Sequence, residues 1–77
     1  MRNVIEVIDQ MLAVIPPEHD ELRVQLEWAQ RDASYKAPEQ MRAQWQMVGE
    51  LLEALIGEPT LEWEKNVASI FNDVEAH

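Results

Sequence analysis

Histidines and carboxylates are the side chains in this sequence with the most potential for chemistry, but their spacing does not bring ligands together. The chain contains two histidines and no cysteine. His19 would have Leu22 and Arg23 one helical turn ahead of it, and neither of these side chains is a metal ligand. We therefore expect His19 to lie in the solvated first turn of a helix, and His77, at the end of the sequence, to be mobile.

Two pairs of glutamates lie three residues apart, a spacing that places two carboxylates on one helical face: Glu18 with Glu21, and Glu50 with Glu53. Such pairs can act as acids, bases or metal ligands, but they are also common on exposed helices. Di-iron helical bundles need Glu-x-x-His on two helices, and neither histidine here follows a glutamate at that distance. A glycine-rich phosphate-binding loop is missing as well. The sequence therefore predicts a protein that is not an enzyme and uses no cofactor and no metal.

The three tryptophans in 77 residues are more informative. Large side chains fill the core of a small protein, but tryptophan is also enriched among the residues that dominate binding energy at interfaces. Trp28 stands off the apolar stripe of its predicted helix, whereas Trp45 lies in the middle of its own stripe. We expect Trp45 to be a core residue and Trp28 to be the best candidate for an interface anchor.

Acidic residues outnumber basic ones by 15 to 6, which gives a net charge of −9. The excess lies mostly in residues 39–77, which carry eight acidic and two basic side chains, with no base between Arg42 and Lys65. Within this base-free stretch we expect an acidic patch formed by Glu50, Glu53, Glu58 and Glu62. The patch can be a solvated face that favours solubility, a docking surface for a basic partner, or an imitation of DNA phosphates.

Prolines and Gly57 divide the chain into segments of helical length, in which apolar residues recur every three or four positions. We predict helices over about 3–15, 17–34, 38–56 and 60–73. No segment alternates with a period of two, so strands are not expected. Short connections favour antiparallel neighbours. The sequence predicts one all-α domain over residues 1–77, either a compact four-helix bundle or two stacked helical hairpins with short loops.

Several residues predict how these helices begin, end and cross. Asn3 is a candidate N-cap of the first helix, and Thr60 of the fourth. Gly57 is suited to a left-handed C-cap after the third helix. Gly49 lies inside that helix, where glycine costs about 1 kcal/mol relative to alanine, so it indicates a close helix crossing or a tolerated weak position.

Glu27 is spaced to form ion pairs on the exposed side of the second helix. Arg23 lies four residues before it and Arg31 four residues after it. Each such pair adds about 0.2–0.5 kcal/mol to an isolated helix.

A short internal similarity bears on the choice between the two architectures. Residues 26–34 and 61–69 both begin Leu-Glu-Trp and both end Ala-Ser. Two related hairpins packed about a pseudo-twofold axis would explain the match, and so would the shared composition of amphipathic helices.

The first and third predicted helices have apolar faces that are too wide for one packed neighbour each. In a chain of this length we do not expect both faces to be covered internally, and an exposed apolar patch marks an interaction site. Self-association is the simplest cover, so we expect a homodimer or an obligate partner.

Together these features predict a non-enzymatic protein-binding module, a small acidic regulator, adaptor or inhibitor that acts by occlusion or bridging. We expect a protein partner, and charge complementarity favours a basic one. The alternatives are an acidic DNA mimic that inhibits a nucleic-acid-binding protein, as some phage and mobile-element accessory proteins do, and a structural subunit of a larger assembly. The net charge argues against direct binding of nucleic acid or of anionic membranes. With no secretory signal and no membrane-length apolar segment, we expect a cytoplasmic protein. The predicted recognition surface contains Trp28, Glu50, Glu53, Glu58 and Glu62.

Overall fold

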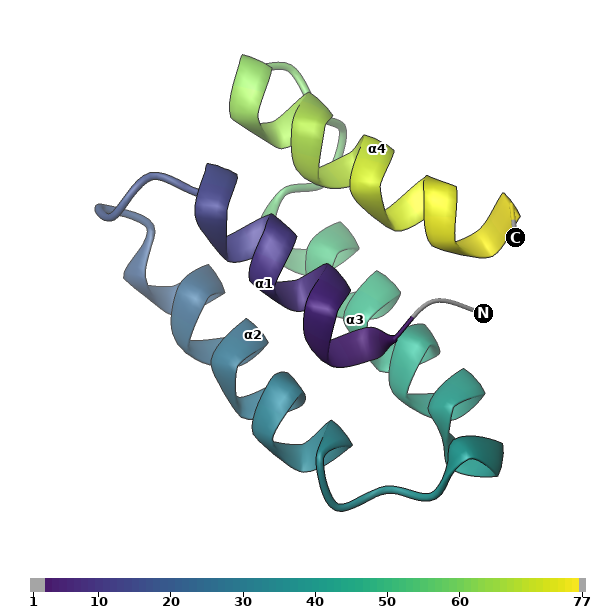
Figure 1. Cartoon of the computed structure of the whole chain (residues 1–77). Helices are drawn as coiled ribbons and strands as arrows, with labels where there is room; N and C mark the ends of the chain where they lie inside the picture. The colour runs from purple at the N-terminus through teal and green to yellow at the C-terminus, as the bar shows by residue number, and fades with distance from the viewer. Residues whose placement is uncertain (1–2, 77) are drawn as a thin grey trace.

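The computed structural model of the chain describes the backbone of residues 3–76 and the side chains of residues 3–73; His77 lies outside the described residues. In this part of the chain the fold consists of helices joined by short loops, without strands (Figure 1). The helices are α1 (Val4–Val14), α2 (Asp20–Ala33), the short 3-10 helix η1 (Pro38–Gln40), α3 (Met41–Leu55) and α4 (Glu62–Ala76). The predicted all-α fold is confirmed.

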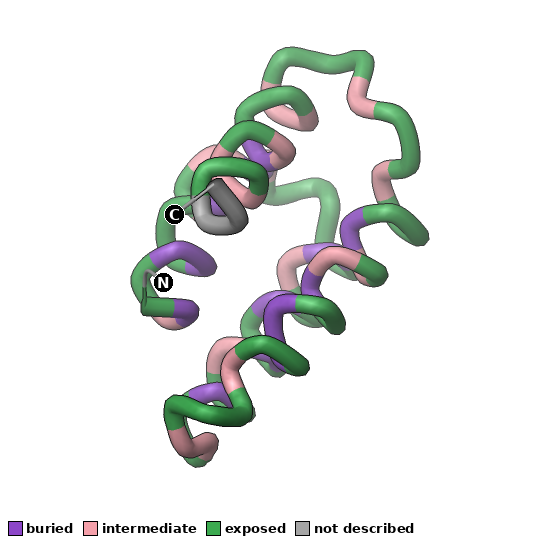
Figure 2. The backbone as a smooth tube through the Cα atoms, turned by 90° about the vertical axis from the view of Figure 1, so that its right-hand side faces the viewer, coloured by how far each residue is buried: buried purple, intermediate pink, exposed green. Residues whose placement is uncertain are grey.

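Helix α1 lies between α2 and α4 and packs against both (Figure 1). Its residues Val4, Val7, Ile8 and Met11 are buried. Figure 2 shows that buried residues recur along the helices next to exposed ones, as expected for amphipathic helices. The wide apolar face of α1 is covered by two neighbouring helices, so the expected uncovered face is not the one on the first helix.

The two halves of the chain do not form equivalent hairpins. Helix α1 packs along α2, whereas α4 packs along α1 rather than along α3. Leu26 is fully buried, but Leu61, its counterpart in the internal similarity, is 54% exposed. The matching letters therefore lie in different environments, and the architecture is a four-helix bundle rather than a repeated hairpin.

The helix ends confirm two of the predicted caps and shift two boundaries. The Asn3 side chain accepts a hydrogen bond from the Ile5 N–H at 2.8 Å, and Gly57 adopts the left-handed conformation with φ +69°. Helix α2 begins at Asp20 rather than Pro17, because the preceding residues form a turn closed by the bond from the His19 N–H to the Pro16 carbonyl.

Helix α4 begins at Glu62 rather than at Thr60, with a capping arrangement that we did not predict. The Glu64 carboxylate accepts hydrogen bonds from the Leu61 N–H at 2.9 Å and the Thr60 N–H at 3.1 Å. A glutamate in the third helical position that reaches back to the chain ahead of the helix is half of a capping box. The carboxylate, not the Thr60 hydroxyl, satisfies the free amides here.

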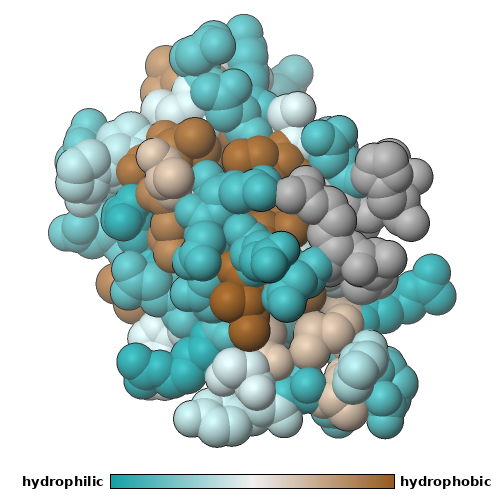
Figure 3. Space-filling view, viewed as in Figure 1, coloured by the Kyte–Doolittle hydropathy of each residue, from teal (hydrophilic) through white to brown (hydrophobic). Residues whose placement is uncertain are grey.

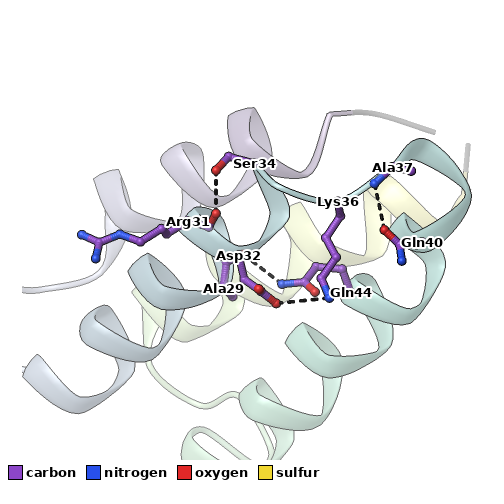
Figure 4. Close-up of polar contacts among 8 residues, drawn as sticks. All are labelled: Ala29, Arg31, Asp32, Ser34, Lys36, Ala37, Gln40 and Gln44. Atoms are coloured by element: carbon purple, nitrogen blue, oxygen red, sulfur yellow. Dashed lines mark hydrogen bonds and ion pairs between the residues drawn. The ribbon is translucent and has the colours of Figure 1, made fainter.

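Three polar side chains of α2 and α3 bind backbone carbonyls of a neighbouring helix. Arg23 donates to the Leu12 and Ile15 carbonyls at 2.8 and 2.9 Å, Gln30 donates to the Ile5 carbonyl at 2.8 Å, and the buried Gln44 donates to the Ala29 carbonyl at 2.9 Å (Figure 4). These bonds tie α1 to α2, and α2 to α3.

The predicted ion pairs of Glu27 with Arg23 and Arg31 are absent from the described residues, where the ion pair found is Lys36–Asp32 at 3.7 Å. Arg23 instead caps the carboxyl end of α1. The carbonyls there have no partner within their own helix and carry the negative end of its dipole, so they compete effectively for the guanidinium.

On the face that Figure 1 presents, hydrophobic side chains emerge in separate patches with hydrophilic ones between them (Figure 3). Within the described residues, no helix combines the length and the apolar character needed to cross a membrane.

Candidate functional site

An open groove of about 620 Å³ runs between α2 and α3, and we call it the Trp28 groove. Its lining residues from α2 and the turn that follows are Gln25, Trp28, Ala29, Arg31, Asp32 and Tyr35. Those from α3 are Met47, Val48, Glu50 and Leu51. Three other hollows on the described residues, of about 410, 340 and 260 Å³, are smaller.

The groove exists because α2 and α3 each carry a second row of residues beside the buried one. The buried row of α2 consists of Leu22, Leu26, Ala29 and Ala33. Trp28 and Asp32 lie one turn apart on the adjacent side of that helix. On α3, Met47 and Leu51 likewise lie beside the buried Val48. Helix α1 packs on the core row of α2, and in the second rows Trp28, Asp32 and Met47 are exposed while Leu51 is partly buried.

Large apolar side chains are exposed together in this groove. Trp28 is 63% exposed, Tyr35 is 83% exposed and Met47 is 53% exposed. Single exposed hydrophobic residues are ordinary on protein surfaces, but neighbouring ones around a groove mark an interaction site. The structure therefore places Trp28 outside the core, as its position off the apolar stripe predicted, while Trp45 is only 3% exposed.

Charged groups surround the apolar floor of the groove and differ in how they are partnered. The Arg31 guanidinium carbon lies 5.7 Å from the centre of the Trp28 ring, within the range of a cation–π contact. The Asp32 carboxylate forms an ion pair with Lys36 at 3.7 Å (Figure 4). Glu50 is exposed and has no ion pair among residues 3–73, so its charge is available to another molecule.

Only two of the five predicted site residues meet at this place. Trp28 and Glu50 line the same groove. Glu53 instead borders a smaller hollow of about 260 Å³ that α3, the following loop and α4 form. Glu58 and Glu62 are exposed and line neither hollow. The four predicted glutamates therefore do not share one hollow.

Sequence reasoning missed Tyr35 and Met47 as members of the site. Tyr35 directly follows the second predicted helix, and it lies seven residues after Trp28, a spacing that returns to the same helical face. Met47 is one of several apolar residues of the third predicted helix. Its exposure depends on where neighbouring helices lie, and the spacing of apolar residues does not contain that information.

A second aromatic contact joins the beginnings of α2 and α4. His19 and Trp63 lie with ring centroids 4.6 Å apart and planes inclined by 39°. His19 is exposed at the amino end of α2, as predicted, but it packs against a tryptophan rather than standing free in solvent.

The pKa of Glu64, near this contact, is held below its usual range. The hydrogen bonds from the Leu61 and Thr60 amides are the main causes; burial opposes them, and the Thr60 hydroxyl and the charge of His19 add smaller effects in the same direction. The Glu64 hydrogen bonds cap the start of α4, and the His19–Trp63 contact joins that start to α2.

The residues that the structure describes hold no group of three or more His, Cys, Asp or Glu side chains placed to bind a metal ion. Comparisons with protein-family models, with curated proteins and with solved structures find no match for this chain. The Trp28 groove therefore stands as the candidate site on its geometry and chemistry alone.

Proposed function

We propose that this chain is a non-enzymatic protein-binding module whose partner docks in the Trp28 groove. The observation that supports it most strongly is the exposure of Trp28, Tyr35 and Met47 around one groove. An exposed tryptophan in a groove contributes little to folding. When a partner covers it, however, it buries a large apolar area. The module would act by occluding a surface of its partner or by bridging two partners.

A second copy of this chain is one candidate partner, but the support for a homodimer is narrower than the sequence suggested. The wide face of α1 is covered by α2 and α4, so it needs no second chain. The apolar surface that a second chain could cover lies on the α3 side, where Met47 stays exposed. Two copies would also each bring a net charge of −9, and this repulsion opposes self-association at low salt.

DNA mimicry has weaker support than docking through an apolar anchor. Imitation of a phosphate backbone needs a continuous array of negative charge. Glu50 and Glu53 border different hollows, and Glu58 and Glu62 line neither. The third alternative, a structural subunit, would show as instability of the isolated chain.

The test is affinity isolation from the cells that encode the protein, with three baits: the wild-type chain, Trp28→Ala and Leu61→Ala. Leu61 is a matched control, since it is 54% exposed and does not line the Trp28 groove. We expect a partner that the wild type and Leu61→Ala retain and Trp28→Ala loses, with little dependence on salt, because an apolar anchor dominates.

Two results would contradict the proposal. Equal retention by Trp28→Ala would show that the groove is not the binding surface. Binding that weakens steeply with ionic strength and competes with DNA would instead support a DNA mimic.

A further inference from the structure

We infer that the occupant of the Trp28 groove is an amphipathic helix of a partner protein, with a basic side chain that lies opposite Glu50. This inference rests on the proposed function and adds the shape and the charge of the partner. Its three parts, the helical form, the length and the basic residue, each follow from the described residues.

The helical form follows from the backbone of the groove. Both walls are α-helices, whose internal amide and carbonyl groups are already bonded within the helix. A peptide in the β conformation needs a free sheet edge to pair its own backbone, and residues 3–76 offer no strand. A partner that buries its backbone here must therefore bring its own hydrogen bonds, as a helix does.

The length follows from the span of the lining residues. On the α2 side these run from Gln25 to Tyr35. At 1.5 Å per residue the part within α2, from Gln25 to Asp32, is about 11 Å or roughly two helical turns, and Tyr35 extends the groove into the turn that follows. A partner helix of that length presents apolar side chains at positions i, i+3 or i+4, and i+7, which can lie between Trp28 on one wall and Met47 and Leu51 on the other.

The basic residue follows from the charges at the rim. On the α2 wall Asp32 is paired with Lys36, and Arg31, which has no ion pair, lies over the Trp28 ring; on the α3 wall the charge of Glu50 is unpaired among residues 3–73. No base occurs in the sequence between Arg42 and Lys65 to balance it. A lysine or arginine on the partner relieves this excess, while an acidic partner, including a second copy of this chain, is repelled by it.

The experiment is selection of a phage-displayed library of random 16-residue peptides on the wild-type chain, with counter-selection on Trp28→Ala. We expect enriched peptides whose apolar residues recur every three or four positions and that carry lysine or arginine beside the apolar row. For a selected peptide, Trp28→Ala should weaken the affinity at least about 30-fold, since a central tryptophan anchor is a binding hot spot. Met47→Ala is the second groove variant in case Trp28→Ala folds poorly, and Leu61→Ala should leave binding unchanged.

The charge is tested with a matched pair of substitutions, Glu50→Gln in the groove and Glu62→Gln outside it. We expect Glu50→Gln to weaken a selected peptide by about two- to fivefold, as for an exposed ion pair, and to reduce the salt dependence of binding. Glu62→Gln should have no effect. Equal effects of the two substitutions would overturn the pairing with Glu50 and indicate nonspecific attraction.

Other outcomes separate this inference from the function on which it rests. Enriched peptides that need Trp28 but are proline-rich or acidic would overturn the basic helix and leave a protein-binding groove in place. A dimer that Trp28→Ala abolishes in sedimentation would do the same, with a second copy as the occupant. If no peptide depends on Trp28 and the chain stays monomeric, both the inference and the proposed function fail.

Discussion

Phe71 of α4 packs end-on against Gly49 of α3, so closely that a Cβ atom at position 49 would lie 2.9 Å from the ring Cζ. Where α4 crosses α3, the Phe71 ring and not the helix backbone comes close to Gly49, so the structure supports a packing role for this glycine over a weak position. Rotation of the ring about its own axis does not move Cζ, and the Trp45 ring lies 5.9 Å away from the Phe71 ring by centroid distance. The contact can therefore be relieved only by moving Phe71 or the helix itself.

We predict that Gly49→Ala destabilises the protein although alanine is the better helix former. Overpacking at the crossing costs about 1–3 kcal/mol and outweighs the gain of about 1 kcal/mol in helix propensity. In a Phe71→Leu background, which removes the ring, the same substitution should become neutral or stabilising. Urea unfolding of the four variants measures both effects, and a full propensity gain in the wild-type background would contradict the packing role of this glycine.

We predict that Arg23 stabilises the fold through α1 rather than through Glu27. Arg23→Met should lower the free energy of unfolding by about 1–2 kcal/mol, because two charge-assisted hydrogen bonds to the Leu12 and Ile15 carbonyls are lost. The control Glu27→Gln should stay within about 0.5 kcal/mol of the wild type, as for an ordinary surface substitution. Equal losses of stability in the two variants would indicate that Arg23 acts through its ion pair with Glu27, as the sequence suggested.

We predict a pH-dependent contribution of Glu64 to stability. Its pKa is lowered in the folded protein, so its hydrogen bonds to the Leu61 and Thr60 amides stabilise the fold above the pKa of the unfolded chain. That stabilisation is lost as the pH falls through the lowered pKa. The difference in stability between the wild type and Glu64→Gln should therefore shrink in acid, and carbon NMR of the carboxylate should show titration below the usual range. A difference that does not vary with pH would contradict the capping role.

We predict opposite roles for two of the tryptophans. Trp28→Ala should cost at most about 1 kcal/mol, the worth of an exposed cation–π contact with Arg31. Trp45→Ala should cost about 3–5 kcal/mol, because it empties a buried site. Chemical unfolding measures both variants. A loss from Trp28→Ala as large as that from Trp45→Ala would mean that Trp28 serves folding and not contact.

The sequence predicts the helices well because local rules decide them. Apolar spacing identifies the buried faces, and Asn3 and Gly57 have the conformational properties that their caps require. The predicted start of α2 at residue 17 lies three residues before the observed start at Asp20, since a proline suited to the first helical turn can also lie in a turn ahead of the helix. Local rules also suggested ion pairs for Arg23, and a longer-range bond to the end of α1 replaced them.

The candidate site was less predictable because it depends on which helices become neighbours. Spacing shows that Met47 lies beside the apolar row of its helix, but whether another helix covers it depends on the position of α4, which packs along α1. Trp28 could be found because it stands apart from the row that its own helix buries. Glu50 and Glu53 could not be separated from the sequence, since only the three-dimensional arrangement shows that they border different hollows.

The most direct test of the Trp28 groove as a protein contact is photo-cross-linking in the cells that encode the chain, with a photoreactive amino acid at position 47 or at position 61. The two native side chains are exposed to nearly the same extent, 53% for Met47 and 54% for Leu61, but only Met47 lines the groove. We predict a discrete cross-linked protein from position 47 that disappears with Trp28→Ala and is absent from position 61. The same cross-links from both positions, or a product from position 47 that Trp28→Ala does not change, would contradict it.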